Sequence, residues 1–314
     1  MKLGFVFPGQ GAQSVGMGLE LATHHEVAAK MIQQADEALG FPLSSLMYQG
    51  PEAQLRLTFH AQPALLTASV TAFEVWVEKT GIRPQVVAGH SLGEYSALVV
   101  AGALDFQTAV RLVYMRGLWM DEAVPAGQGA MAAILGMNTA NLEEVCREAS
   151  EKGSVVELAN INCPGQIVIS GTAQAVQRAS QLAKVAGARR VIPLEVSGPF
   201  HSSLMRPAAA KLSVALAETR FVPAAVPIVA NVDAAVHMEP AEIRTALETQ
   251  LYQPVLWEQG VYTMLKMGVE GFVEFGPGNV LSGLIRKIDR RIPVFHVEDE
   301  VSLRETEQDL KNLI

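Results

Sequence analysis

Residues 85–103 read QVVAGHSLGEYSALVVAGA, an apolar run followed by a glycine-flanked serine and a second apolar segment. The pattern predicts a strand over Gln85–Ala88 and a helix over Glu94–Ala103. Between them lies a G-x-S-x-G motif centred on Ser91, whose glycines permit the tight turn that lifts a serine hydroxyl out of a sheet edge. A chance match in a glycine-rich loop is the alternative. The preceding strand and the following helix favour a nucleophilic serine.

Strand-length apolar runs alternate with helical segments on both sides of this motif. That alternation is typical of β-α-β units, so we expect an α/β fold with a mostly parallel sheet. The expected strands are Leu3–Phe7, Gln85–Ala88, Ile228–Val232 and Gly271–Phe275. The expected helices are Val15–Leu39, Pro63–Glu78, Glu94–Ala103, Phe106–Ala123 with Asp105 as its N-cap, one after Gly278, and an amphipathic one over Val301–Ile314.

The order of the expected helices and strands changes after a Pro/Gly-rich linker at 125–129. The elements that follow come in the order β-α-β-β-α-β, which is that of a ferredoxin-like unit. We therefore predict a hydrolase-like catalytic body of residues 1–126 and 198–314, interrupted by a ferredoxin-like α+β subdomain of residues 127–197. The expected elements of the subdomain are strand Ala130–Leu135, helix Thr139–Glu151, strands Val155–Ala159 and Gln166–Ser170, helix Ala173–Ala186 and strand Arg190–Val196.

The composition excludes several classes of protein. A chain of 314 residues that is 49% hydrophobic and 18% charged can bury a sizeable core, which excludes a disordered protein. Cys146 and Cys163 are the only cysteines, so a disulfide scaffold is excluded and a reducing cytoplasm is expected. The net charge of -8 argues against nucleic-acid binding. Neither a signal peptide nor an apolar run of membrane-spanning length is found, so we expect a soluble protein.

A nucleophilic serine needs a base, and His201 is the candidate among the seven histidines. It follows a predicted strand and a Gly198-Pro199 turn and stands at the mouth of a predicted helix. This topology brings it to the carboxyl ends of the parallel strands, the edge that carries Ser91. An ordinary loop histidine is the alternative. No acidic residue between Ser91 and His201 stands out as a third triad member, which departs from the usual hydrolase order of serine, acid and histidine.

Arg116 lies on an apolar helix face. Its neighbours three and four positions away are Leu112, Val113, Trp119 and Met120, so its side chain is expected to point toward the core. A buried guanidinium has to be paired. The partner is either a protein carboxylate or a ligand carboxylate held by two parallel hydrogen bonds, and the spacing leaves both open.

No nucleotide, metal or cofactor site is predicted. The loop Gly9-Gln10-Gly11 follows a strand, but it lacks the third glycine of a dinucleotide motif and the Gly-Lys-Ser/Thr of a phosphate loop. The two cysteines are far apart in the sequence and no HExxH motif occurs. The basic run Arg286–Arg291 is typical of a solvated helix face, with docking of a partner as the alternative.

Six motifs in order resemble the malonyl-CoA:acyl carrier protein transacylase family, and the resemblance runs nearly end to end, the inserted segment included. Each motif alone is weak, whereas all six together are specific. They are Phe7-Pro-Gly-Gln-Gly11, Gln62-Pro-Ala-Leu65, Gly89-His-Ser-Leu-Gly-Glu-Tyr-Ser-Ala97, Gly198-Pro-Phe-His201, Gln250-Leu-Tyr-Gln-Pro254 and Phe275-Gly-Pro-Gly278.

The resemblance implies a catalytic role for several residues. Ser91 would be the acylated nucleophile, and His201 would be its general base and later the general acid. The backbone carbonyl of Gln250 would orient the histidine in place of an acidic residue. The backbone N–H groups of Gln10 and Leu92 would form the oxyanion hole.

The resemblance also implies the substrates. Arg116 would bind the free carboxylate of the malonyl group, and Phe200 is similar to the aromatic residue found where malonyl is preferred over branched extender units. The reaction would move malonyl from malonyl-CoA to the phosphopantetheine thiol of acyl carrier protein through a malonyl-serine, in ping-pong order. No cofactor would be permanently bound, neither nucleic acid nor membrane would be a partner, and the enzyme would act as a cytoplasmic monomer.

The carrier protein of this family is acidic, so an acidic enzyme needs a local basic patch to receive it. Arg189, Arg190 and the run Arg286–Arg291 are the candidates. Charge reversal at Arg190 and Arg286 is expected to weaken transfer to the carrier without slowing acylation from CoA. Three other functions stay open: a stand-alone malonyl loader for a polyketide synthase, a serine thioesterase or other hydrolase, and a non-catalytic carrier-binding module.

Overall fold

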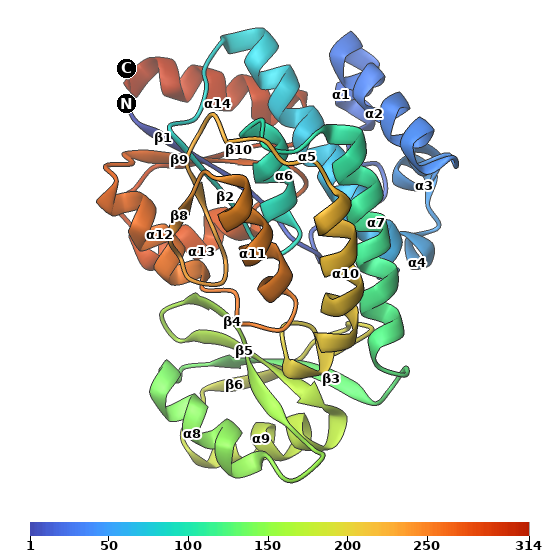
Figure 1. The fold of residues 1–314 in the computed structure, drawn as a ribbon. Coiled ribbons are helices and arrows are strands. Elements are labelled where there is room, and N and C mark those ends of the chain that lie inside the picture. The colour runs from blue at the N-terminus through green and yellow to red at the C-terminus, as the bar shows by residue number, and fades with distance from the viewer. Residues whose placement is uncertain (314) are drawn as a thin grey trace.

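The computed structural model describes residues 1–313 of the chain. Within this range a central sheet has the strand order β10-β9-β1-β2-β7-β8, and every neighbouring pair is parallel except β7 with β8 (Figure 1). The strands are β1 Leu3–Phe7, β2 Val86–Gly89, β7 Ile228–Val229, β8 Val236–His237, β9 Gly271–Phe275 and β10 Val294–Val297. The expected α/β class with a mostly parallel sheet is confirmed.

Both faces of the central sheet are covered, which explains why β1 is apolar at every position. Phe5 and Phe7 lie in the core on one face, where their rings contact that of Phe275. Val6, between them, lies in the core on the other face together with Trp257. All of β1 is buried, and a strand covered on both faces reads as a continuous apolar run instead of an alternating one.

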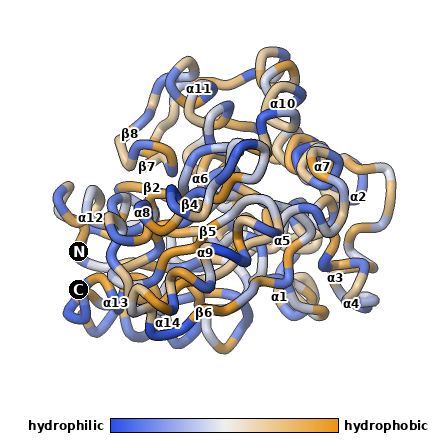
Figure 2. The backbone as a smooth tube through the Cα atoms, turned by 90° about the horizontal axis from the view of Figure 1, so that it is seen from below, coloured by the Kyte–Doolittle hydropathy of each residue, from blue (hydrophilic) through white to orange (hydrophobic). Residues whose placement is uncertain are grey.

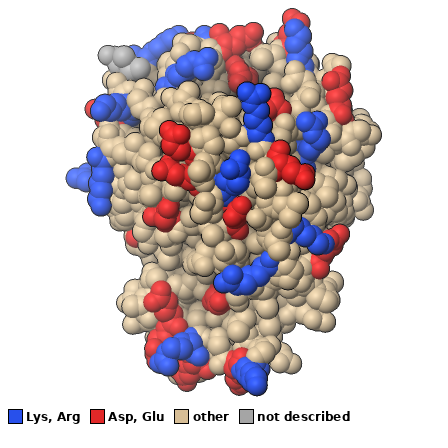
Figure 3. All heavy atoms as spheres, viewed as in Figure 1, with Lys and Arg blue, Asp and Glu red and all other residues tan. Residues whose placement is uncertain are grey.

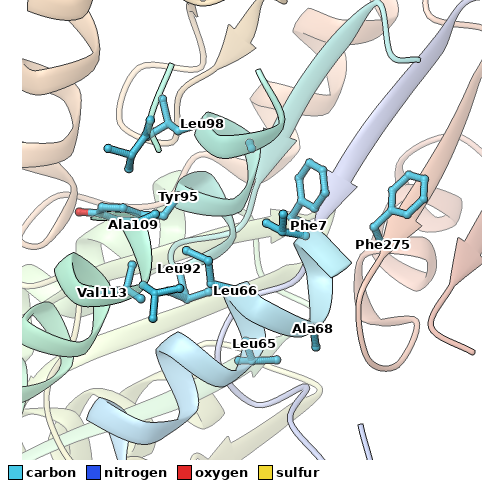
Figure 4. Packing of buried hydrophobic residues seen from close by; sticks show 14 of the residues in the cluster. Phe7, Leu65, Leu66, Ala68, Leu92, Tyr95, Leu98, Ala109, Val113 and Phe275 are labelled. Carbon is cyan, nitrogen blue, oxygen red and sulfur yellow. The ribbon is translucent and has the colours of Figure 1, made fainter. Parts of the chain in front are cut away.

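Helix α5 is the central helix of the body, buried along most of its length and packed against α2, α6 and α7 (Figure 1). Figure 4 shows its Leu66 near Leu92 and Val113 in the same core. Apolar residues gather on the inner segments and hydrophilic ones on the outer helices and loops (Figure 2). The helices of the body are α1 Leu19–His24, α2 Glu26–Leu39, α3 Leu43–Gln49, α4 Glu52–Leu55, α5 Thr58–Thr80, α6 Gly93–Val100, α7 Phe106–Ala123, α10 Arg206–Glu218, α11 Pro240–Gln250, α12 Trp257–Lys266, α13 Val280–Ile288 and α14 Glu300–Leu313.

A second, antiparallel sheet of order β4-β5-β3-β6 lies beside the body, with α8 and α9 on its outer face (Figure 1). Its elements are β3 Gly129–Leu135, α8 Thr139–Ala149, β4 Val156–Cys163, β5 Gln166–Thr172, α9 Ala173–Val185 and β6 Arg190–Pro193. They follow the predicted β-α-β-β-α-β order. The alternating side chains of β3 explain why the second sheet lies between its two helices and the body. Ala132 and Ile134 pack on the two helices, whereas Met131 joins the core of the body.

We propose the division into a body of 1–126 and 198–314 and an inserted subdomain of 127–197 on this basis. The second sheet and its helices have a hydrophobic cluster of their own, to which the body adds only Leu256 among the described residues. The inner face of the sheet is nevertheless part of the main core, so the subdomain is docked firmly on the body.

The sequence expectations need correction near the N-terminus. The single helix expected over Val15–Leu39 is two helices, α1 and α2. Gly16 and Gly18 have φ angles of 99° and 76°, outside the helical region, and the extended backbone of His25 separates the two helices. Helix α5 begins at Thr58, before the expected start at Pro63, so Pro63 lies inside the helix, where its ring removes one intrahelical N–H donor.

Other expected elements differ at their ends. Strand β7 stops at Val229 instead of Val232, because the backbone N–H of Asn231 donates to the Glu94 side chain instead of to a neighbouring strand. Strand β6 stops at Pro193, and β4 runs on to Cys163. The expected N-cap Asp105 is confirmed, since its carboxylate accepts from the backbone N–H of Thr108. Elements that the sequence did not predict are β8, β10, α3, α4, α11 and α12.

The C-terminal expectation is confirmed for the described residues, because α14 begins at Glu300 and packs on β10. Residue 314, which the expected helix included, lies outside them. Within residues 1–313, no helix combines the length and hydropathy needed to cross a membrane.

Candidate active site

Ser91 stands on a sharp turn between β2 and α6. Its φ angle is 51°, in the left-handed region that residues other than glycine rarely adopt. The flanking glycines make the turn possible: a Cβ at Gly89 would lie 1.9 Å from the carbonyl carbon of Gly93, and one at Gly93 would lie 2.0 Å from the Phe7 oxygen. Every glycine of the motif is therefore required by close packing of backbone on backbone.

His201 lies against the serine, although 110 positions separate them in the sequence. Its Nε2 is 2.8 Å from Ser91 Oγ, and its Nδ1 is 2.8 Å from the backbone carbonyl oxygen of Gln250. Because a carbonyl only accepts, Nδ1 carries the proton and Nε2 is free to accept one from the serine hydroxyl. The orienting group is a neutral carbonyl, in the position where many serine enzymes have a carboxylate.

The surroundings keep His201 neutral. Burial, followed by the positive charge of Arg116, lowers the pKa of His201 to about 3. Only 4% of the residue is exposed. The imidazole is therefore in its basic form throughout the neutral pH range.

Arg116 is fully buried and forms no ion pair among the residues that the structure describes. Its guanidinium donates to three neutral oxygens: Gln62 Oε1 at 2.9 Å, Gln250 Oε1 at 3.0 Å and Ser91 Oγ at 3.2 Å. Its Nε has no partner within residues 1–313. Arginine keeps its charge even where burial lowers its pKa, as it does here. The sequence left open whether Arg116 pairs with a protein carboxylate or with a ligand carboxylate. Among residues 1–313, the structure places no protein carboxylate in an ion pair with it.

Two backbone N–H groups lie beside the serine without a hydrogen bond to any residue in 1–313, those of Gln10 and Leu92. Leu92 directly precedes α6, so its N–H lies at the positive end of a helix. The loop that carries Gln10 packs onto the serine turn, where a Cβ at Gly9 would lie 2.4 Å from the His90 oxygen. The N–H of Ser91 itself is occupied, because it donates to Asn231 Oδ1 at 2.7 Å.

A cavity of about 310 Å³ opens above Ser91 and His201. Its walls come from the second sheet and from the body, since Met131 and Asn160 belong to the second sheet whereas Phe200 directly precedes the histidine. Arg116 lies behind the serine, outside the cavity lining. The lining residues are Gln10, Gly11, Gln13, Arg56, His90, Ser91, Met120, Met131, Asn160, Leu194, Glu195, Val196, Phe200 and His201.

The structure thus places all seven predicted site residues around one cavity or directly behind it. It also adds three that the sequence reasoning did not assign: Gln62, Glu94 and Asn231. The first two lie inside motifs that carry the family resemblance, so those motifs were an available signal. Asn231 is the one polar residue inside the predicted strand Ile228–Val232, which is a weak signal.

The buried neutral histidine predicts acid sensitivity. Its pKa is lower in the folded protein than in the unfolded chain, so the unfolded state binds more protons below about pH 6.5 and stability falls as pH drops toward 3. We expect the low pKa of His201 to lower the free energy of unfolding by about 2 kcal/mol between pH 7 and pH 5. Urea unfolding at both pH values would measure it, and His201→Gln should lose less over that interval. An equal loss in parent and variant would contradict the assignment.

The comparisons with known proteins agree along nearly the whole chain. Residues 4–303 match the family model of the acyl transferase domain. A malonyl CoA-acyl carrier protein transacylase of Bacillus subtilis (strain 168) is 52% identical over 310 residues, which are 99% of this chain and 98% of the relative. The crystal structure of an acyl carrier protein S-malonyltransferase from Vibrio cholerae has a TM-score of 0.95 and 46% identity, covering 98% of this chain and 100% of that one.

A third likeness is to a structure described as a type II PKS acyl-carrier protein in complex with its malonyl-transacylase. The TM-score is 0.96 at 45% identity, and the match covers 98% of this chain and 100% of that one. Likeness at this level and over this length shows common descent as well as a common fold. The chain belongs to the acyl transferase domain family and, within it, to the malonyl CoA-acyl carrier protein transacylases.

Proposed function

We propose that this enzyme moves the malonyl group from malonyl-CoA to the phosphopantetheine thiol of acyl carrier protein through a malonyl ester on Ser91. The observation that carries the proposal is the buried guanidinium of Arg116, which lies 3.2 Å from the serine oxygen and forms no ion pair among residues 1–313. A cation without a protein counter-ion beside a nucleophile selects an acyl group that ends in a carboxylate. Malonyl is such a group.

The first half-reaction forms the ester. His201 Nε2 takes the proton of the Ser91 hydroxyl as Oγ attacks the thioester carbon. The oxyanion accepts from the N–H groups of Gln10 and Leu92, and the tetrahedral intermediate expels CoA as His201 returns the proton to its sulfur. The acid and the base are the same imidazole, which the Gln250 carbonyl holds in one orientation.

The second half-reaction runs the same steps in reverse order. The carrier thiol enters in place of CoA, His201 takes its proton, and the thiolate attacks the malonyl ester carbon. The ester C–O bond breaks, and His201 returns the proton to Ser91 Oγ. One site serving two thiols in turn gives ping-pong kinetics. CoA and carrier are substrates in this scheme, and no bound cofactor takes part in it.

Intact-protein mass spectrometry tests the proposal. Mixing the enzyme with malonyl-CoA is expected to add one malonyl group to Ser91, and addition of holo acyl carrier protein is expected to remove it and yield malonyl-carrier. A serine hydrolase would instead release free malonate without the carrier. Release of malonate faster than transfer would therefore contradict the transferase assignment. Comparing carriers of fatty-acid and polyketide systems as acceptors would show which pathway the enzyme serves.

We also propose a docking surface for the carrier, formed by Arg189, Arg190 and Lys287. Leu135 in β3 pairs with Gln166 on one side and with Arg190 on the other. Lys287 Nζ donates to Gln166 Oε1 at 2.9 Å, so the two basic segments named from the sequence meet across the second sheet. On the face shown in Figure 3, acidic and basic side chains are interspersed.

Charge reversal at this surface is expected to affect only the second half-reaction. Arg190→Glu with Lys287→Glu should lower kcat/KM for the carrier about tenfold or more, because an acidic partner is no longer attracted. Acylation by malonyl-CoA should stay unchanged. We choose Lys287 over Arg286, because the Arg286 guanidinium donates to the Val294 carbonyl and supports β10. Lys30→Glu with Arg147→Glu changes net charge equally, and an equal effect there would contradict the proposed surface.

We further propose that the enzyme acts as a monomer in the cytoplasm. Support for a monomer is that Ser91, His201, Gln250 and Arg116 all come from one chain. Support for a reducing compartment is that Cys146 and Cys163 are both free and buried. Size-exclusion chromatography with light scattering would test the first statement, and cell fractionation the second.

A further inference from the structure

The strained conformation of Ser91 has a partner that the proposed mechanism does not use. Asn231, in the loop after β7, is only 3% exposed. Its Oδ1 accepts from the Ser91 N–H at 2.7 Å, and its Nδ2 donates to the Gly89 carbonyl at 2.7 Å. A single buried amide therefore holds the backbone on both sides of His90. A strained backbone conformation persists only where its surroundings stabilise it, and the two hydrogen bonds of Asn231 stabilise that of Ser91.

Asn231 is in turn held by a buried carboxylate. Glu94 Oε2 accepts from the Asn231 backbone N–H at 2.9 Å and from Gln250 Nε2 at 3.0 Å. Glu94 is 3% exposed and has no ion-pair partner within residues 1–313. Burial raises the pKa of Glu94 to about 7, while the hydrogen bonds from Asn231 and Gln250 oppose that rise. A buried polar group at this depth is stable only with such partners.

The same carboxylate helps to orient the Gln250 side chain. Glu94 Oε2 and the Ser91 carbonyl oxygen both accept from the NH₂ group of the Gln250 amide at 3.0 Å, which leaves Gln250 Oε1 facing Arg116 Nη2, 3.0 Å away. The backbone carbonyl of the same Gln250 accepts from His201 Nδ1. Hydrogen bonds thus link Glu94 to Ser91 through Asn231. They also link Glu94 to both His201 and Arg116 through Gln250.

The bond to Asn231 also determines which donors face the oxyanion. The Ser91 N–H, which serves as an oxyanion donor in some serine enzymes, points to Asn231 Oδ1 here. Stabilisation of the oxyanion is left to Gln10 and Leu92. Asn231 therefore positions the serine and at the same time removes one donor from the site.

We infer that Asn231 and Glu94 are positioning residues for transacylation, which hold Ser91 Oγ in line with His201 without touching substrate. The inference rests on the proposed role of Ser91 as the nucleophile. The alternative is that backbone packing at Gly89 and Gly93 alone maintains the turn, in which case loss of either side chain lowers stability but not the rate of the folded enzyme.

The experiment compares single-turnover acylation by malonyl-CoA in Asn231→Ala, Glu94→Leu and Glu94→Gln. The first two should lower the acylation rate about 10²-fold with KM changed less than about threefold, because displacement of a reacting atom acts on the chemical step. Glu94→Gln keeps an acceptor oxygen for both donors and should recover most of the rate. That rescue separates hydrogen bonding from general loss of packing.

Glu274→Leu is the matched control. Glu274 is also a buried carboxylate that accepts backbone N–H groups, but it lies in β9 and its donors, Leu281 and Ser282, are in the first turn of α13, outside the site. It should lower Tm and leave the acylation rate of folded protein unchanged. If Asn231→Ala does not fold, Asn231→Asp keeps the shape, sets a carboxylate oxygen against the Gly89 carbonyl and should show the same loss of rate.

Acylation within twofold of the parent in Asn231→Ala or Glu94→Leu would overturn the inference, as would an equal loss of rate in Glu274→Leu. Ser91→Ala distinguishes this failure from that of the proposed function. An inactive Ser91→Ala beside a fully active Asn231→Ala overturns only the positioning role, whereas an active Ser91→Ala overturns the proposed function itself.

Discussion

Ser91→Ala is expected to lower the rate of malonyl transfer about 10⁴- to 10⁶-fold, the range found when a serine nucleophile is removed. Ser91 Oγ is the atom that His201 Nε2 contacts at 2.8 Å, and without it no ester can form. The variant should show no burst of CoA release and no malonyl adduct by intact mass. Stopped-flow detection of free CoA with a thiol reagent, followed by mass spectrometry, would measure both.

Ser96→Ala is the matched control for this variant. Ser96 lies on the helix that Ser91 precedes, is fully buried, and its hydroxyl has no hydrogen-bond partner within residues 1–313. Its loss should leave transfer unchanged. His201→Ala should be about as inactive as Ser91→Ala, and the double variant no worse, because the two groups act as a unit. Substantial transfer by Ser91→Ala would contradict the role of Ser91 as the nucleophile.

Arg116→Ala is expected to lower kcat/KM for malonyl-CoA about 10²- to 10³-fold, since truncating one partner of a buried charge pair costs about 2–5 kcal/mol. The rate with acetyl-CoA should stay the same or rise, because acetyl leaves the guanidinium without an anion in the parent. The selectivity for malonyl over acetyl is therefore the quantity to measure. Parallel acylation assays with malonyl-, methylmalonyl- and acetyl-CoA would give it.

Two further variants sharpen this test. Arg116→Lys keeps the charge but loses the planar pair of donors, so it should recover only part of the selectivity. Arg111→Ala, on the exposed face of the same helix α7, should have no effect. Removing the cation also removes one cause of the low pKa of His201, so that pKa should rise in Arg116→Ala. Equal losses for malonyl and acetyl substrates would contradict the assigned role of Arg116.

The serine turn could be predicted from the sequence because its causes are local. The apolar run of β2, the G-x-S-x-G spacing and the following helix all lie within about twenty positions, and the glycines are required by contacts that a Cβ would break. The same holds for the Asp105 cap and for the apolar face that turns Arg116 inward. Boundaries set by single residues were less predictable, as the extended His25 and the early start of α5 show.

The sequence by itself therefore determined the α/β class, the β-α-β-β-α-β order of the elements around the second sheet and the position of the serine turn, because periodicity and glycine spacing are short-range properties. Only the tertiary structure decided which partners meet there. Arg116 could have been paired with a protein carboxylate, and the base could have had an acidic orienter. Folding instead brings the Gln250 carbonyl to His201 and leaves Arg116 without an ion pair in the part of the chain that the structure describes. These contacts join residues 49 and 134 positions apart, and no local pattern specifies them.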